Sequence, residues 1–114
     1  MTNPPVYNDG VFSLYKIYDK DGLYPVEDIK DMEFEIWFKE LSISDKTKNE
    51  LHQNGIEVTT KIRIPQYKKI DSRCVLKIEN EFHRVYNVFH FRNKDGFLET
   101  DITLVRYRPW QKMS

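Results

Sequence analysis

The sequence predicts a mainly β protein, a small antiparallel β-barrel of about six strands with one long projecting loop or short helix. Three observations lead to this prediction. Alanine, the best helix former, is absent from all 114 residues. Aromatic residues reach 14%, and apolar and polar residues alternate in short segments separated by turn sequences. We expect a single domain, 1–114, with the barrel core at about 11–107 and a C-terminal tail at 108–114.

The first third of the chain contains two predicted strands. Residues 11–18 are rich in β-branched and aromatic residues and are followed by the turn sequence DKDG. Residues 23–31 are acidic and interrupted by a proline, which predicts a loop or an edge segment. Apolar residues then alternate from Met32 to Phe38, as in a half-buried strand. Their phase shifts before Leu41, so we expect a β-bulge near residues 39–40 that bends the strand.

The predicted projecting segment spans residues 44–55. Ser44 can cap a short helix that ends at the Asn54-Gly55 pair. Its only large apolar residue is Leu51, and a helix with one apolar anchor is held only weakly on a core. We therefore expect a projecting segment, with an ordinary polar connection between strands as the alternative.

The remaining predicted strands follow in order. Alternation from Ile56 to Ile64 makes one strand, which Pro65 ends because proline cannot donate to a strand ladder. The loop PQYKKIDSR leads into residues 74–78, and a turn at ENE leads into residues 82–92. The NKDG turn, with Gly96 in the left-handed position, precedes the last strand at 97–107.

The chain offers no predicted catalytic, cofactor-binding or metal site, so we expect no enzyme and no cofactor. His83 and His90 lie seven residues apart on one predicted strand, which would point them to opposite faces. Cys74 falls in an apolar alternation and has no second cysteine, which predicts a buried thiol and a reducing compartment. The sequence has no P-loop, dinucleotide fingerprint or nucleophile motif. Its N-terminus does not resemble a secretory signal, and no apolar run is long enough for a membrane span, so no membrane partner is expected.

Charge is balanced overall, with 18 basic and 18 acidic residues, but it is unevenly distributed. Residues 1–55 hold 11 Asp and Glu against 6 Lys and Arg, whereas residues 56–114 hold 7 against 12. This asymmetry fits a face that attracts polyanions, a contact between copies of the chain, or two solvated surfaces. Asp31, Glu33 and Glu35 alternate along one strand face, and such a row is usually a solvated surface.

Nucleic-acid binding is an alternative function. Basic and aromatic side chains of the second half could form a groove that stacks and neutralises a single strand. They are Lys61, Arg63, Lys68, Lys69, Arg73 and Arg84, with Tyr67 and Tyr86. The net charge of zero and the lack of a recognised binding signature count against this alternative.

The order of the segments resembles a known family. The chain reads EIWFKEL, a polar insertion, EVTTKIRIPQYKKID and then RCVLKIENEFHRVYNVFHFRNKDGFLETDITLVRY. Over roughly residues 30–107, this pattern is similar to the small head–tail adaptor (head closure, or stopper) proteins of long-tailed bacteriophages. The positions that carry the resemblance are Trp37, Phe38, Thr59, Thr60, Ile62, Arg63, Ile64, Ile70, Asp71, Leu76, Ile78, Tyr86, Val88 and the strand 99–106. Ile64-Pro65 replaces the family's more frequent Arg-Tyr pair, and Phe38 replaces Val or Ala.

The resemblance implies a structural virion protein at the head–tail interface, made in the cytoplasm of the bacterial host. Such a protein closes the portal channel after DNA packaging and provides the docking site for the tail. The implied partners are portal and adaptor proteins, tail proteins and packaged DNA, which is contacted without sequence specificity. Copies of the protein would form a ring, dodecameric in the virion and able to exist as monomers in isolation. A tail-completion or terminator protein is the alternative within the same class.

The resemblance also directs attention to two groups of residues. A channel-closing segment has to project, so Lys46, Lys48, Asn49 and His52 become candidate channel residues. The candidate assembly contacts are Lys68, Lys69 and Trp110. Trp110 lies beyond the last predicted strand, where it either folds back on the barrel or anchors in a partner.

Overall fold

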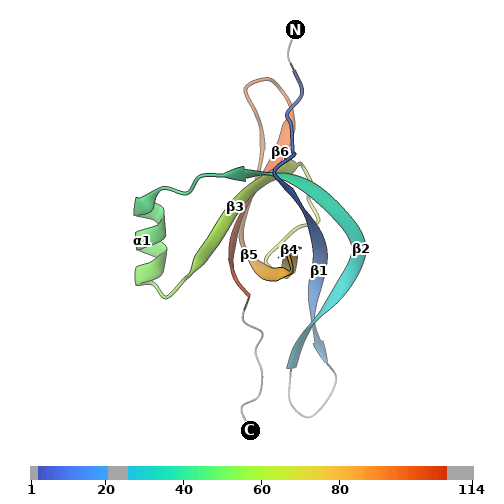
Figure 1. Ribbon diagram of the computed structural model, residues 1–114, viewed down its shortest axis with the longest axis vertical. Coiled ribbons are helices and arrows are strands. Elements are labelled where there is room, and N and C mark those ends of the chain that lie inside the picture. Colours follow the sequence, from blue (N-terminus) through green and yellow to red (C-terminus); the bar gives the residue numbers. More distant parts are fainter. Residues whose placement is uncertain (1–2, 21–25, 108–114) are drawn as a thin grey trace.

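The computed structural model describes residues 3–20 and 26–107, which form a closed barrel (Figure 1). The strands are β1 (Gly10–Lys20), β2 (Val26–Leu41), β3 (Val58–Pro65), β4 (Cys74–Ile78), β5 (Glu81–Arg92) and β6 (Leu98–Arg106). Helix α1 (Asp45–Gln53) lies between β2 and β3. Neighbouring strands are antiparallel, in the order β1-β2-β3-β6-β5-β4. The predicted fold class is confirmed.

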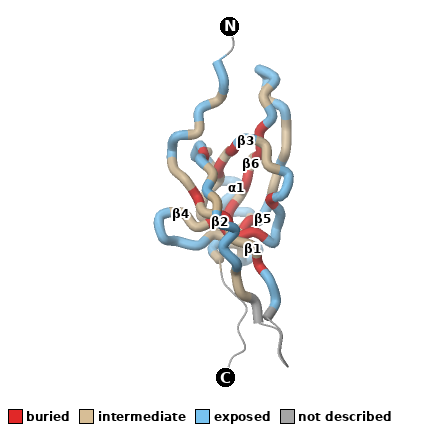
Figure 2. Tube along the Cα trace, turned by 90° about the vertical axis from the view of Figure 1, so that its right-hand side faces the viewer, coloured by how far each residue is buried: buried red, intermediate tan, exposed pale blue. Residues whose placement is uncertain are grey.

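The core is built from the inward face of each strand. Alternation places Ile102 and Leu104 inside, while Asp101 and Thr103 face outward, as predicted. Figure 2 shows the buried segments gathered in the middle of the molecule. The fully buried apolar side chains are Phe12, Leu14, Ile62, Ile64, Leu76, Val75, Val85, Ile102, Leu104 and Cys74.

The β1–β2 hairpin confirms one prediction and contradicts another. β2 begins at Val26, so residues 26–31 form an edge strand, one of the two predicted alternatives. The bulge of β2 lies around Glu33, and the pairing expected to break near residues 39–40 continues without a shift. Glu33 adopts a φ of 62°, and its amide donates to Asp31 Oδ1 at 2.8 Å. This side-chain bond stabilises the local turn and explains why the bulge forms here.

The phase shift before Leu41 has another cause. β2 pairs with β1 as far as Phe38 and with β3 from Lys39 to Leu41. The strand therefore leaves one neighbour for the other as it passes the end of the barrel. Leu41 is half-buried and lies outside the core. The change of neighbouring strand from β1 to β3 therefore alters which side chains of β2 are covered, and no inserted residue is needed.

Tight turns join the later strands. Glu79 and Asn80 have φ values of 50° and 67°, as a two-residue hairpin turn between antiparallel strands requires. In the β5–β6 hairpin, Gly96 has a φ of 89°, as the NKDG sequence predicts. Asn93 Oδ1 accepts hydrogen bonds from the amides of Asp95 and Phe97, at 2.9 and 3.0 Å, and so fixes this turn.

The connection from β3 to β4, residues 66–73, crosses one end of the barrel. β3 and β4 lie on opposite sides, separated by two strands in either direction. Ile70 of this connection is 2% exposed and belongs to the core. The Tyr67 ring packs edge-on against Phe34, with centroids 5.8 Å apart. The loop that looks basic in the sequence is therefore a plug for the barrel.

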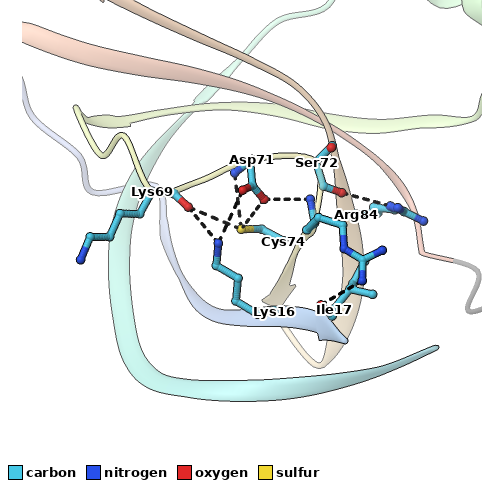
Figure 3. Close-up of polar contacts among 8 residues, drawn as sticks. Lys16, Ile17, Lys69, Asp71, Ser72, Cys74 and Arg84 are labelled. Carbon is cyan, nitrogen blue, oxygen red and sulfur yellow. Dashed lines mark hydrogen bonds and ion pairs between the residues drawn. The ribbon is translucent and has the colours of Figure 1, made fainter. Parts of the chain in front are cut away.

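Polar contacts hold the plug in place (Figure 3). Lys16 Nζ donates to the Lys69 carbonyl at 3.1 Å and lies 3.7 Å from Asp71 Oδ2. The amide of Arg73 donates to Asp71 Oδ1 at 2.9 Å, and its carbonyl accepts the amide of Ile17 at 2.8 Å. These bonds satisfy backbone groups of a segment that has no strand pairing, so the crossing has a defined path.

The plug predicts a large effect of one substitution. Ile70→Ala removes a buried side chain and leaves a cavity at the end of the barrel. We expect it to lower the free energy of unfolding by about 2–4 kcal/mol, measured by urea denaturation. Lys69→Ala, at the exposed neighbouring residue, is the matched control and should change it by less than about 0.5 kcal/mol. Equal effects of the two substitutions would show that Ile70 does not plug the barrel.

Candidate functional site

Helix α1 stands beside the barrel without burying a residue in it (Figure 1). Ser44 caps its first turn, because Ser44 Oγ accepts the amide of Thr47 at 3.2 Å. The helix ends at Gln53, Asn54 is its C-cap, and Gly55 adopts a φ of 77°. The predicted short helix and both of its ends are confirmed.

The four candidate channel residues do not share one face of α1. Lys48 and His52 are one helical turn apart, and both line recesses between α1 and the barrel. At about 100° per residue, Lys46 lies roughly 160° around the helix from Lys48. Lys46 therefore faces away from the barrel, whereas Asn49, about 100° from Lys48 and about 60° from His52, lies on the flank of the helix. The structure divides the predicted cluster into a pair near the barrel, one residue on the outer side and one on the flank.

The end of the barrel opposite the plug is lined by acidic residues. A recess of about 300 Å³ there has Phe38, Ile78 and His83 among its lining residues. It shares lining residues with an adjoining recess of about 550 Å³ that extends to Lys48 of α1. We call this end the acidic mouth, defined by its four carboxylates: Asp9, Glu40, Glu79 and Glu81. The sequence does not reveal this site, because its four carboxylates come from three segments far apart in the chain.

His83 is the titratable group at the base of the acidic mouth. Its Nδ1 lies 2.8 Å from Thr59 Oγ1, and its Nε2 lies 4.0 Å from Glu81. Burial lowers the pKa of His83, and the effect exceeds the opposing attraction of Glu81. A neutral imidazole at this position is consistent with its single close polar partner, a hydroxyl.

The predicted orientation of the histidines is wrong. The β5–β6 register shifts between Val85 and Asn87, so β5 contains a bulge that changes the alternation. His83 and His90 consequently share the inward side, where His90 Nδ1 lies 2.7 Å from the buried Thr100 hydroxyl. An odd spacing gives opposite faces only in a strand without a bulge.

Metal ligation and thiol chemistry are not favoured by this geometry. Within residues 3–20 and 26–107, no group of three or more His, Cys, Asp or Glu side chains is placed to hold a metal ion. Cys74 is buried, as predicted, and burial raises the pKa of its thiol. The acidic mouth and the outer side of α1 can therefore act through charge and contact.

The basic side chains of the second half are only partly free for a ligand. Arg63 makes two bonds to the Asp101 carboxylate, at 2.6 and 2.9 Å, and these raise its pKa. Tyr67 is packed against the core and cannot serve as an open stacking surface. Lys68 and Lys69 are exposed on the plug, where they can reach a partner. Trp110 lies outside the residues that the structure describes.

The N-terminal segment is tied to the last strand through a buried carboxylate. Glu99 is 3% exposed, and it accepts hydrogen bonds from the Tyr7 hydroxyl at 2.9 Å and from Asn93 Nδ2 at 2.7 Å. Desolvation and the neighbouring carboxylate raise the pKa of Tyr7 far above its usual range. The bond fixes residues 3–9 across the barrel close to the β5–β6 hairpin, with a groove between the two segments.

Comparison of the chain with known protein families and with curated protein sequences finds no match. No helix among the residues that the structure describes is long and apolar enough to cross a membrane.

Removal of the Tyr7 hydroxyl tests whether its bond to Glu99 tethers the N-terminal segment. Tyr7→Phe keeps the ring but leaves one oxygen of the buried Glu99 without its donor. We expect the free energy of unfolding to fall by about 1–3 kcal/mol, measured by urea denaturation. Tyr18→Phe is the matched control, because the bond from Tyr18 to Asp28 is exposed. A Tyr7→Phe protein as stable as the control would contradict the tether.

Burial of His83 predicts a pH dependence of stability. Below about pH 6.5 the unfolded chain binds a proton at this residue that the folded protein resists. The free energy of unfolding should therefore fall as the pH drops below that value, and level off below the lowered pKa. His83→Gln removes this contribution, so its stability should vary less between about pH 7 and pH 5. Identical slopes in the two proteins, measured by urea denaturation, would rule out the effect.

Proposed function

We propose that the chain is a structural subunit of a bacteriophage head–tail connector that closes the portal channel after DNA packaging and receives the tail. One observation carries the proposal: a rigid barrel, plugged by its own loop, holds out a helix that buries nothing. Combined with the resemblance of residues 30–107 to head closure proteins, this arrangement suits a subunit that builds a ring and reaches into its lumen.

The plug favours a channel that runs between the subunits of a ring over a channel that runs through the barrel of each subunit. Ile70, Tyr67 and the core fill the interior of the barrel, so DNA cannot pass through it. A closing element then has to project from the outer surface, and α1 is such an element. Lys46 on its outer side and Asn49 on its flank can touch DNA phosphates without reading sequence, so these two are favoured among the four candidate channel residues.

The two ends of the barrel differ in charge. The acidic mouth carries four carboxylates, whereas the plug exposes Lys68, Lys69 and Arg73 against the single carboxylate of Asp71. A closure ring has one side toward the head and one toward the tail, and it needs a different contact on each. A subunit with an acidic end and a basic end can meet two partners in one fixed orientation.

The proposal is tested on tail-less, DNA-filled capsids of the phage that encodes the chain. Added protein should appear as density at the portal vertex in negative-stain images, and DNA should become protected from nuclease. In a variant with residues 45–53 replaced by a glycine-serine linker, we expect vertex binding without DNA retention. The linker should change the free energy of unfolding by less than about 1 kcal/mol, because α1 buries no residue.

Charge reversal on the two sides of α1 refines this experiment. Lys46→Glu should increase DNA leakage more than Lys48→Glu, which changes a residue near the barrel. Capsids that ignore the protein would overturn the proposed function. Binding to the ends of isolated tail tubes instead would assign the chain to tail completion.

A further inference from the structure

Two strands of the barrel have long edges that no described strand covers. β2 pairs with β1 as far as Phe38, but it meets β3 only from Lys39 to Leu41. β5 pairs with β6 along its length, but it meets β4 only as far as Arg84. We call the two uncovered stretches the β2 edge, residues 28–37, and the β5 edge, residues 85–92. Uncovered edges are sites where another strand can add.

The β5 edge has the composition of a strand that accepts a partner. Its sequence, VYNVFHFR, is rich in β-branched and aromatic residues. Phe89 is 60% exposed and stacks on Phe91, with ring centroids 5.6 Å apart. The amide of Asn93 donates to the Phe97 carbonyl at 2.8 Å. Counting back by alternation, the amides of Val88, His90 and Arg92 point away from β6 and toward the edge.

The β2 edge is different, because its own carboxylates cover it. The amide of Ile29 donates to Asp28 Oδ1 at 2.8 Å, and the amide of Glu33 donates to Asp31 Oδ1 at 2.8 Å. Glu35 adds a further exposed negative charge. Such an edge disfavours nonspecific addition of another strand. A partner strand must bring positive charge to replace these bonds.

We propose that the β2 edge of one copy of the chain adds to the β5 edge of the next, so that copies join head to tail. This inference rests on the proposed ring and names the surfaces that form it. Arg92 belongs to the β5 edge, with Lys94 just beyond it, and these two residues face the acidic residues of the β2 edge in such a contact. In Figure 1 the β1–β2 hairpin and the β5–β6 hairpin lie at opposite ends of the long axis.

Charge selects this contact over pairing of like edges. Two β2 edges would bring carboxylates against carboxylates, and two β5 edges would bring arginines and a lysine to the same sheet. A contact between different edges pairs opposite charges and, unlike a two-fold contact, leaves one edge of each kind open for further copies. Such a series closes into a ring if its rotation allows.

Charge exchange between the edges tests the proposal. The first variant combines Glu33→Lys and Glu35→Lys; the second combines Phe89→Glu and Arg92→Glu. All four positions are exposed, so both proteins should fold, which urea denaturation checks. At millimolar concentration and low salt, sedimentation velocity should show oligomers larger than dimers for the unmodified chain. Each variant alone should self-associate with a dissociation constant at least about tenfold higher than that of the unmodified chain. An equal mixture of the two variants should recover association, because the charges on the two edges are again opposite.

The outcomes separate the alternatives. If the first variant alone associates as strongly as the unmodified chain, β5 edges pair with each other. If the second variant alone does so, β2 edges pair with each other. Failure of the mixture to recover, or a chain that stays monomeric, also overturns the proposal. Asn49→Glu, at an exposed residue of α1 outside both edges, is the control and should associate normally.

Hydrogen exchange gives a second readout on the full chain. The amides of Val88, His90 and Arg92 should exchange quickly in dilute protein and slowly in the oligomer. Those of Asn87, Phe89 and Phe91 should be protected in both, because they pair with β6. Recovery by the mixture without capsid capping would overturn only the proposed function, and capping without recovery would overturn only this contact.

Discussion

The crossing of the barrel end by residues 66–73 is the constraint on which the rest of the structure depends. With β3 and β4 on opposite sides of the barrel, their connection has to pass over an opening, and its backbone there has no ladder to join. Ile70 is buried in the core and fills the opening, and the hydrogen bonds and ion pair around Asp71 hold the polar groups of the crossing segment. The interior is thereby filled from one end, and ligand contacts are left to the acidic mouth, α1 and the outer surface.

The same closure leaves the strands unevenly paired. A barrel of so few strands bends its longest strands away from their neighbours, so β2 meets β3 over three residues and β5 meets β4 over four. The two resulting edges are treated differently by the sequence. Carboxylates and a bulge guard the β2 edge, while the β5 edge carries exposed aromatic rings. This contrast gives the barrel two edges of different chemistry, one acidic and one aromatic.

Much of the architecture could be predicted from local signals. Alternation identified most of the strands, and Ser44 with Gly55 gave both ends of α1. The bulges could not be predicted, since each depends on a local bond or on a register with another strand, as at Glu33 and Asn87. Their consequence for the site is large, because one bulge reverses the expected orientation of the histidines.

The candidate site was less predictable than the fold. The basic appearance of residues 66–73 concealed the plug, since a lysine pair on the surface and a single buried isoleucine can share one loop. The acidic mouth gathers residues distant in sequence, and only the closed topology brings Asp9 and Glu79 together. The four candidate residues of α1 stay a prediction, and helical geometry spreads them around the helix.

Helix α1 has a consequence for how such a chain can vary. The two strands that flank it pair with each other, β2 also pairs with β1 and β3 with β6, and the helix buries no residue in the core. Substitutions and length changes between residues 44 and 55 are therefore nearly free of folding constraints. The segment can therefore be exchanged while the barrel stays the same, so selection can adapt its surface without redesigning the core. The same freedom makes Asn49 a convenient place for a spectroscopic label.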